Sequence, residues 1–151
     1  MYWQQIGSAK KALKTMPVSA KAVLVSKDGQ ILLMRKSSGL VDLPGGKVEE
    51  GEDLYLALER EIHEETGLKI KEYEFTASWV KHHPELGDRL VIIFEARVDL
   101  KAKKIDIEMS EEHGWFDFIC PTIVDEIGDM PPGYGNAIKI CHDRYLTRSN
   151  S

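Results

Sequence analysis

The chain has 151 residues, of which 42% are hydrophobic and 30% are charged, and this composition is typical of an ordinary globular protein. Its formal net charge of −5 argues against a stable nucleic-acid binder, which is expected to be basic, although a bound metal and a few local cations would still accommodate a small nucleotide. The length predicts a single domain over 1–151, monomeric or homodimeric, in which 1–17 forms an N-terminal extension.

The first segment, residues 1–17, mixes Trp3 and Ile6 with lysines and ends at Pro17, which predicts a short docking helix or strand. It lacks the continuous apolar region of a signal peptide. No run in the chain approaches the ~20 apolar residues of a membrane-spanning helix. We therefore expect a cytoplasmic protein without membrane association.

Two apolar runs, 21–26 and 30–36, are separated by Lys-Asp-Gly and predict a β-hairpin. Arg35, near the end of the second run, has two interpretations, an exposed edge residue or a phosphate contact. A loop over 37–43 then leads to Pro44-Gly45-Gly46, where glycine lets the backbone approach a ligand or an ion closely.

The stretch from Gly46 to Leu68 predicts a helix between a glycine turn and a Thr-Gly pair. Leu54, Leu58 and Ile62 repeat every four residues, so the helix has an apolar stripe that can pack on a core. Gly67 is expected to end this helix in the left-handed conformation.

A second face of this helix carries Glu61, Glu64 and Glu65, which project from one side of it. Like charges stacked in this way repel one another unless a cation offsets them. The only basic residue nearby is Arg60, which cannot balance three anions. A hard divalent ion such as Mg²⁺ or Mn²⁺, which prefers oxygen ligands and also binds substrate phosphates, fits this pattern.

The stretch over 46–68 resembles the Nudix box of hydrolases that act on nucleoside-diphosphate derivatives. The fixed positions of that box are occupied here by Gly46, Glu52, Arg60, Glu61, Ile62, Glu64, Glu65, Gly67 and Leu68. The resemblance implies an α/β fold, the Nudix-type α/β/α sandwich with a mixed β-sheet, in which the apolar stripe of the helix packs against the sheet. It also implies metal-dependent hydrolysis of a diphosphate linkage.

Roles for individual residues follow from the resemblance. The implied metal ligands are the carbonyl of Gly45 and the carboxylates of Glu61, Glu64 and Glu65. The glutamates of the box would share the ligand and general-base roles, with Glu52 as a further acidic member. Arg60 would pair with a glutamate and fix its rotamer.

The second half of the chain predicts strands over 69–81 and 89–100, separated by a polar loop over 82–88 that has the character of a substrate pocket. His82 and His83 in this loop are candidates for contact with a phosphate or a base, although paired loop histidines are often simply solvated.

A further strand is predicted over 111–118, entered through Glu111 and Glu112. In several Nudix enzymes a loop glutamate before a late strand binds metal or acts as the base, and Glu112 is the first choice for that role here. The alternative is a solvated entrance to the strand.

The C-terminal part predicts a short helix over 120–127, a loop over 128–135 and a closing amphipathic helix over 136–146. Cys120 and Cys141 are too few for a disulfide framework, and we expect both to be buried thiols.

The substrate is expected to be a nucleoside triphosphate or a nucleotide sugar, bound by Arg35, Trp79 and His83. Trp79 offers a stacking surface for a base, with core packing as the equal alternative. The triphosphate is favoured because the chain is short and lacks the added N-terminal domain of many ADP-ribose enzymes, although Pro84 has a spacing seen in ADP-ribose pyrophosphatases.

Other activities stay open at this point. One is a pyrophosphatase for ADP-ribose or dinucleoside polyphosphates. Another is a non-catalytic nucleotide-binding module, which is expected to lose box acids that this chain keeps. The last is a metal-dependent isomerase of the same fold, for which no additional acid and base residues can be placed.

Overall fold

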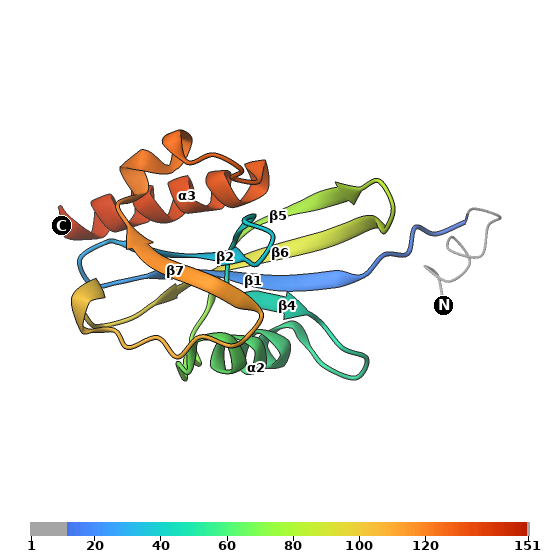
Figure 1. The fold of residues 1–151 in the computed structure, drawn as a ribbon, viewed down its shortest axis with the longest axis horizontal. Coiled ribbons are helices and arrows are strands. Elements are labelled where there is room, and N and C mark those ends of the chain that lie inside the picture. Colours follow the sequence, from blue (N-terminus) through green and yellow to red (C-terminus); the bar gives the residue numbers. More distant parts are fainter. Residues whose placement is uncertain (1–11, 151) are drawn as a thin grey trace, which may run out of the picture.

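The computed structural model describes residues 12–150. A seven-stranded mixed β-sheet lies between helix α2 (Leu54–Thr66) on one face and helix α3 (Pro132–Ser149) on the other (Figure 1). This arrangement confirms the α/β/α sandwich expected from the sequence. Neither helix has the length and apolarity needed to cross a lipid bilayer.

The sheet is organised around its first strand, which contacts three others. The strands are β1 (Val18–Val25), β2 (Ile31–Lys36), β3 (Val41–Asp42), β4 (Gly45–Lys47), β5 (Glu74–His83), β6 (Gly87–Arg97) and β7 (His113–Ile119). Their order is β3-β2-β1-β6-β5, with β4 also paired to β1 and β7 to β2. The β1–β6 pair is parallel, whereas the others are antiparallel. Two short 3-10 helices, Ala102–Lys104 and Pro121–Glu126, complete the described elements.

Strand β1 contributes to two hydrophobic cores because its side chains alternate between the faces of the sheet. Val23 and Val25 belong to the core beneath α3. Ala22 and Leu24 belong to the core beneath α2. The sheet is therefore apolar on both faces, and each helix covers one of them.

Helix α2 packs through the stripe that its sequence predicts. Leu58 and Ile62 are fully buried, and Leu54 packs against the same core. The helix begins after Asp53, whose carboxylate accepts a hydrogen bond from Leu56 N at 2.8 Å, an N-cap. It ends at Gly67, which has a φ of 77° and confirms the expected left-handed stop.

The predicted loop over 82–88 is wrong for most of its length. Strand β5 continues to His83 and β6 begins at Gly87, so only a tight turn separates them. The pairs His82↔Asp88 and His83↔Gly87 extend the hairpin to that turn. Polar residues continue a strand where it projects past the core, because neither of its faces is then covered.

Other boundaries also differ from the expectation. The strand expected from Lys69 begins at Glu74, and β3 and β4 were not predicted because they are only 2 and 3 residues long. Helix α3 begins at Pro132, inside the expected loop, because proline suits the first turn of a helix, where its missing N–H has no intrahelical partner. Most of the segment 1–17 lies outside the described residues, and 12–17 form neither helix nor strand.

The expectation for the thiols is half correct. Both cysteines are free, but Cys141 is buried in the core under α3, whereas Cys120 is exposed. Cys120 directly precedes the short helix at Pro121–Glu126, and its position at the end of β7 leaves it outside either core.

Candidate functional site

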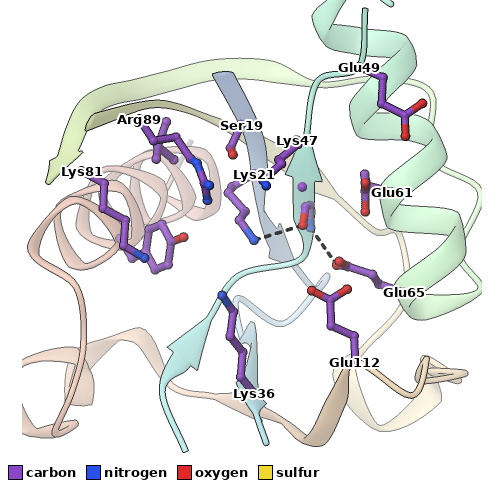
Figure 2. A pocket seen from close by; sticks show the side chains of 14 residues that line it. Ser19, Lys21, Lys36, Lys47, Glu49, Glu61, Glu65, Lys81, Arg89 and Glu112 are labelled. Carbon is purple, nitrogen blue, oxygen red and sulfur yellow. Dashed lines mark hydrogen bonds between the residues drawn. The ribbon is translucent and has the colours of Figure 1, made fainter. Parts of the chain in front are cut away.

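One cleft of about 400 Å³ brings together side chains from distant parts of the chain (Figure 2). Its acidic side is formed by Glu61 and Glu65 of α2 and by Glu112, which precedes β7. Its basic side carries residues from five strands. The cations that line the cleft are Lys21, Lys36, Lys47, Lys81 and Arg89.

The acidic side has a donor set that suits a hard metal ion. Ligand atoms of Glu65, Glu112 and His113 all lie within 4.8 Å of one another. Burial raises the pKa of Glu65 to about 7 and also raises the pKa of Glu61. Because burial disfavours the ionised form of both carboxyl groups, their negative charge is costly in the protein alone. A divalent cation with a preference for oxygen would offset that charge, so the residues present fit such an ion.

Gly45 connects the acidic side to the basic side through its backbone. Its N–H donates to Glu65 Oε2 at 2.8 Å, and its carbonyl accepts from Lys21 Nζ at 3.0 Å. The residue has a φ of 131°, and a Cβ at this position would collide with the carbonyl oxygen of Ala20. Only glycine fits here. The Gly45 carbonyl, expected to bind metal, keeps one lone pair beyond the one that Lys21 uses.

The neighbouring glycine makes room for a carboxylate. A Cβ at Gly46 would lie 2.6 Å from the carboxylate carbon of Glu61, whereas Gly46 itself has no positive φ. The Glu61 side chain therefore occupies the space that any other residue at 46 would need.

We expect Gly46→Ala to lower turnover by about 10²-fold. The added methyl group would displace the Glu61 carboxylate by up to about 1 Å, and a displacement of this size misplaces a reacting group. The fold should survive, since the added methyl group meets the end of a flexible side chain rather than the backbone. The matched control is Gly128→Ala, whose Cβ would meet nothing within 4 Å. Steady-state kinetics and thermal unfolding of both variants test this. Equal activity of the two variants would contradict it.

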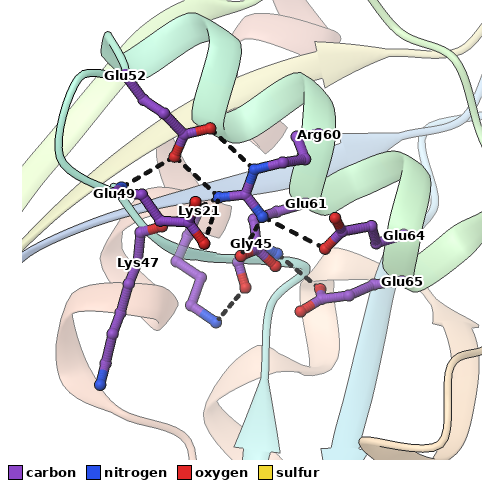
Figure 3. A network of polar contacts seen from close by, with 9 residues as sticks. All are labelled: Lys21, Gly45, Lys47, Glu49, Glu52, Arg60, Glu61, Glu64 and Glu65. Carbon is purple, nitrogen blue, oxygen red and sulfur yellow. Dashed lines mark hydrogen bonds and ion pairs between the residues drawn. The ribbon is translucent and has the colours of Figure 1, made fainter.

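Arg60 organises the glutamates of α2 from outside the cleft (Figure 3). Its Nε and Nη2 donate to the two oxygens of Glu52 at 2.8 and 2.9 Å, a bidentate pair, and its Nη1 donates to Glu61 Oε1 at 3.1 Å. The hydrogen bonds from Arg60 lower the pKa of Glu52 to about 2. Glu52 is thus held as an anion by Arg60, and the same guanidinium orients Glu61.

Glu64 is placed differently from the other two helix glutamates. Its side chain is 56% exposed and lies 3.3 Å from Arg60 Nη1. It does not line the cleft, whereas Glu61 and Glu65 do. The geometry therefore brings Glu61, Glu65 and Glu112 together in the cleft. Glu64 lies outside the cleft, where it contacts Arg60.

A buried group of charges, of which Lys21 also lines the cleft, was not found from the sequence. Lys21 Nζ donates to Asp42 Oδ1 at 3.0 Å, and His113 Nε2 lies 2.9 Å from Asp42 Oδ2. Burial alone would raise the pKa of Asp42, but hydrogen bonds with His113 and Lys21 outweigh it and lower that pKa. The hydrogen bond with Asp42 raises the pKa of His113. The available signal was Lys21 itself, a lysine that begins an otherwise apolar run.

Two of the three expected substrate contacts are occupied elsewhere. Arg35 Nη1 donates to Gly39 O at 2.8 Å, and its guanidinium lies 5.5 Å from the ring centroid of Trp115. His83 Nδ1 accepts from the backbone of Glu85 and Leu86, so it stabilises the β5–β6 turn. Neither residue lines the cleft.

Trp79 also lies outside the cleft lining. Its ring packs edge-on against Tyr134, with centroids 5.9 Å apart, and it contacts Gly133 at the start of α3. The indole face is therefore used for docking α3, which is the core-packing alternative considered from the sequence.

Comparison with known proteins agrees with this geometry. The family model described as the NUDIX domain matches residues 15–133. A NAD-capped RNA hydrolase of Chromobacterium violaceum is 32% identical over 131 residues, which cover 82% of this chain and 43% of that protein. A CTP pyrophosphohydrolase of Escherichia coli is 34% identical over 79 residues, which cover 49% of this chain and 56% of that protein. The chain thus spans about half the length of these relatives.

Solved structures share the fold. A MutT protein from Methanosarcina mazei superimposes with a TM-score of 0.73 at 23% identity. The superposition covers 93% of this chain and 100% of the MutT chain. A Caenorhabditis elegans Ap4A hydrolase superimposes with a TM-score of 0.73 at 20% identity, covering 88% of this chain and 99% of its own.

Proposed function

The chain belongs to the NUDIX family of hydrolases, and from that premise we propose that it cleaves a diphosphate linkage in a nucleoside diphosphate derivative with the help of a divalent metal ion. The observation that carries this proposal is the cleft in which carboxylates face cations (Figure 2). Carboxylates can hold a metal ion, and cationic side chains can hold phosphate oxygens. Cleavage of a phosphoanhydride uses the metal ion and the cationic side chains together.

The acidic side would hold the metal. Glu61, Glu65 and Glu112 are the proposed ligands, and Mg²⁺ or Mn²⁺ bound there would neutralise phosphate oxygens and lower the pKa of a bound water. The Gly45 N–H fixes Glu65 Oε2, so Glu65 Oε1 is the oxygen that remains free for the site. A carboxylate of this set would accept the proton of the attacking water.

The cations would bind and orient the phosphates. Lys36 and Lys47 lie in the cleft with their ammonium groups available to phosphate oxygens, while Lys21 is committed to Asp42, Leu43 O and Gly45 O. Lys21 therefore supplies positive charge from below without itself contacting the substrate. Arg60 keeps Glu61 in position through a direct hydrogen bond to its carboxylate.

The proposal is tested by a substrate panel assayed with Mg²⁺ and with EDTA. The panel contains deoxynucleoside triphosphates, CTP, 8-oxo-dGTP, ADP-ribose, a nucleotide sugar, a dinucleoside polyphosphate, NADH and NAD-capped RNA, which include the compound classes named for relatives. We expect Mg²⁺-dependent release of phosphate, pyrophosphate or a nucleotide from at least one member. If every compound stays intact at saturating Mg²⁺, the proposal is wrong.

A further inference from the structure

Two cations on the basic side of the cleft form a pair that the cleavage chemistry leaves without a task. Lys81 of β5 and Arg89 of β6 are direct cross-strand partners, so their side chains leave the sheet on the same face. Both point into the cleft from the side opposite Glu61, Glu65 and Glu112 (Figure 2).

Neither cation is in contact with a carboxylate within the described part of the chain. Over residues 12–150, no side-chain hydrogen bond or ion pair involves Lys81 or Arg89, and Arg89 Nε is a buried donor with no acceptor. Burial lowers the pKa of Lys81, and the nearby ammonium of Lys36 lowers it further, although the more distant Asp42 acts to raise it. A buried donor without an acceptor destabilises the folded state, so an anionic ligand here would offset a cost already present in the fold.

The surroundings of this pair do not suit a nucleobase. Among residues 12–150, the only aromatic residue that lines the cleft is Tyr134, which is 2% exposed, and its hydroxyl lies 3.5 Å from Asp42. A base could not stack on a ring that is covered in this way. The chemistry presented by Lys81 and Arg89 is that of a phosphate site.

We propose that Lys81 and Arg89 bind a phosphate group beyond the diphosphate bridge, so that the cleft selects nucleoside triphosphates over nucleotide sugars. This inference rests on the proposed function, because it takes the bridge to lie at the acidic side. A triphosphate chain has one phosphate more than the bridge needs, and that phosphate reaches the opposite side of the cleft. A nucleotide sugar would place an uncharged sugar there and leave both cations unpaired.

The first test measures binding without catalysis. Inorganic tripolyphosphate is titrated into the protein in EDTA at low ionic strength. Under these conditions no metal ion at the acidic side contributes to binding. We expect Lys81→Gln and Arg89→Gln each to weaken binding about tenfold, which is about 1.4 kcal/mol, and the double variant to weaken it about a hundredfold. Lys103→Gln removes one exposed charge from the 3-10 helix at Ala102–Lys104 and should bind like the parent. Arg89→Lys, which keeps the charge, should retain part of the affinity.

The second test compares two substrates in the presence of Mg²⁺. Both Gln variants should lose about tenfold in kcat/KM for CTP and little for UDP-glucose. Unchanged tripolyphosphate affinity in the variants, or equal losses for both substrates, would overturn the second phosphate site. If no compound is hydrolysed but the variants still lose tripolyphosphate binding, the proposed function fails and the site stands.

Discussion

Glu65→Gln is expected to lower turnover by at least about 10²-fold while the fold stays intact, because the change removes a charged ligand and keeps the shape of the side chain. The amide oxygen of glutamine can still accept the Gly45 N–H, which now donates to Glu65 Oε2 at 2.8 Å. Added Mg²⁺ should raise the unfolding temperature of the parent but not that of the variant. Turnover equal to that of the parent at limiting Mg²⁺ would contradict this assignment.

The same variant should change how stability depends on pH in metal-free protein. Burial raises the pKa of Glu65 from 4.5 to about 7, so between these values the folded state holds a proton that the unfolded state has released. Stability of the parent therefore falls as pH rises through this window. Above this pH window, ionisation of the buried Glu65 lowers the stability of the parent by about 3 kcal/mol, a loss that the neutral glutamine does not have. Urea unfolding in EDTA across this range should show that the free energy of unfolding of the variant rises relative to that of the parent as pH increases. Parallel pH profiles of the two proteins would show that Glu65 is not buried as described.

Lys21→Met is expected to destabilise the protein by about 3–5 kcal/mol, because it leaves a buried carboxylate without its cation. The Lys21 and Asp42 side chains are only 11% and 4% exposed. The ammonium also donates to Leu43 O and Gly45 O, so the change removes donors from two carbonyls that flank Pro44. Denaturant unfolding measures the loss.

The matched control is Lys14→Met, which breaks an exposed pair between Lys14 and Asp88 at 2.8 Å. The Lys14 side chain is 58% exposed, and such pairs contribute ~0–1 kcal/mol. A similar small loss at Lys21 would mean that the buried pair is not formed. Combining Lys21→Met with Asp42→Asn should recover part of the loss, because the unpaired anion is then gone.

The local pattern of the sequence was sufficient to predict helix α2 and the faces of its side chains. A helix repeats every 3.6 residues, so the faces that carry Leu58, Ile62, Glu61 and Glu65 follow from spacing alone. The αL stop at Gly67 follows from the need of that conformation for glycine. These features depend on contacts within one element, which a single sequence contains in full.

The basic side of the cleft could not be predicted in the same way. Lys81 and Arg89 face the site because β5 and β6 pair in one particular register, and a shift of one residue would turn both side chains to the other face. The residues chosen from the sequence, Arg35, Trp79 and His83, have suitable chemistry but are occupied by Gly39, Tyr134 and the hairpin turn. Which partner a side chain takes depends on tertiary packing.

The parallel pairing of β1 with β6 has a consequence for synthesis of the protein. Residues 18–25 emerge from the ribosome early, but their partners at 90–97 emerge only after α2 and β5 have been made. Until then β1 has an open edge, which is prone to pair with other chains, and long-range pairing of this kind forms slowly. A nascent chain that stops short of β6 carries every residue of the 46–68 stretch, yet it lacks Arg89 and Glu112 and cannot assemble the cleft.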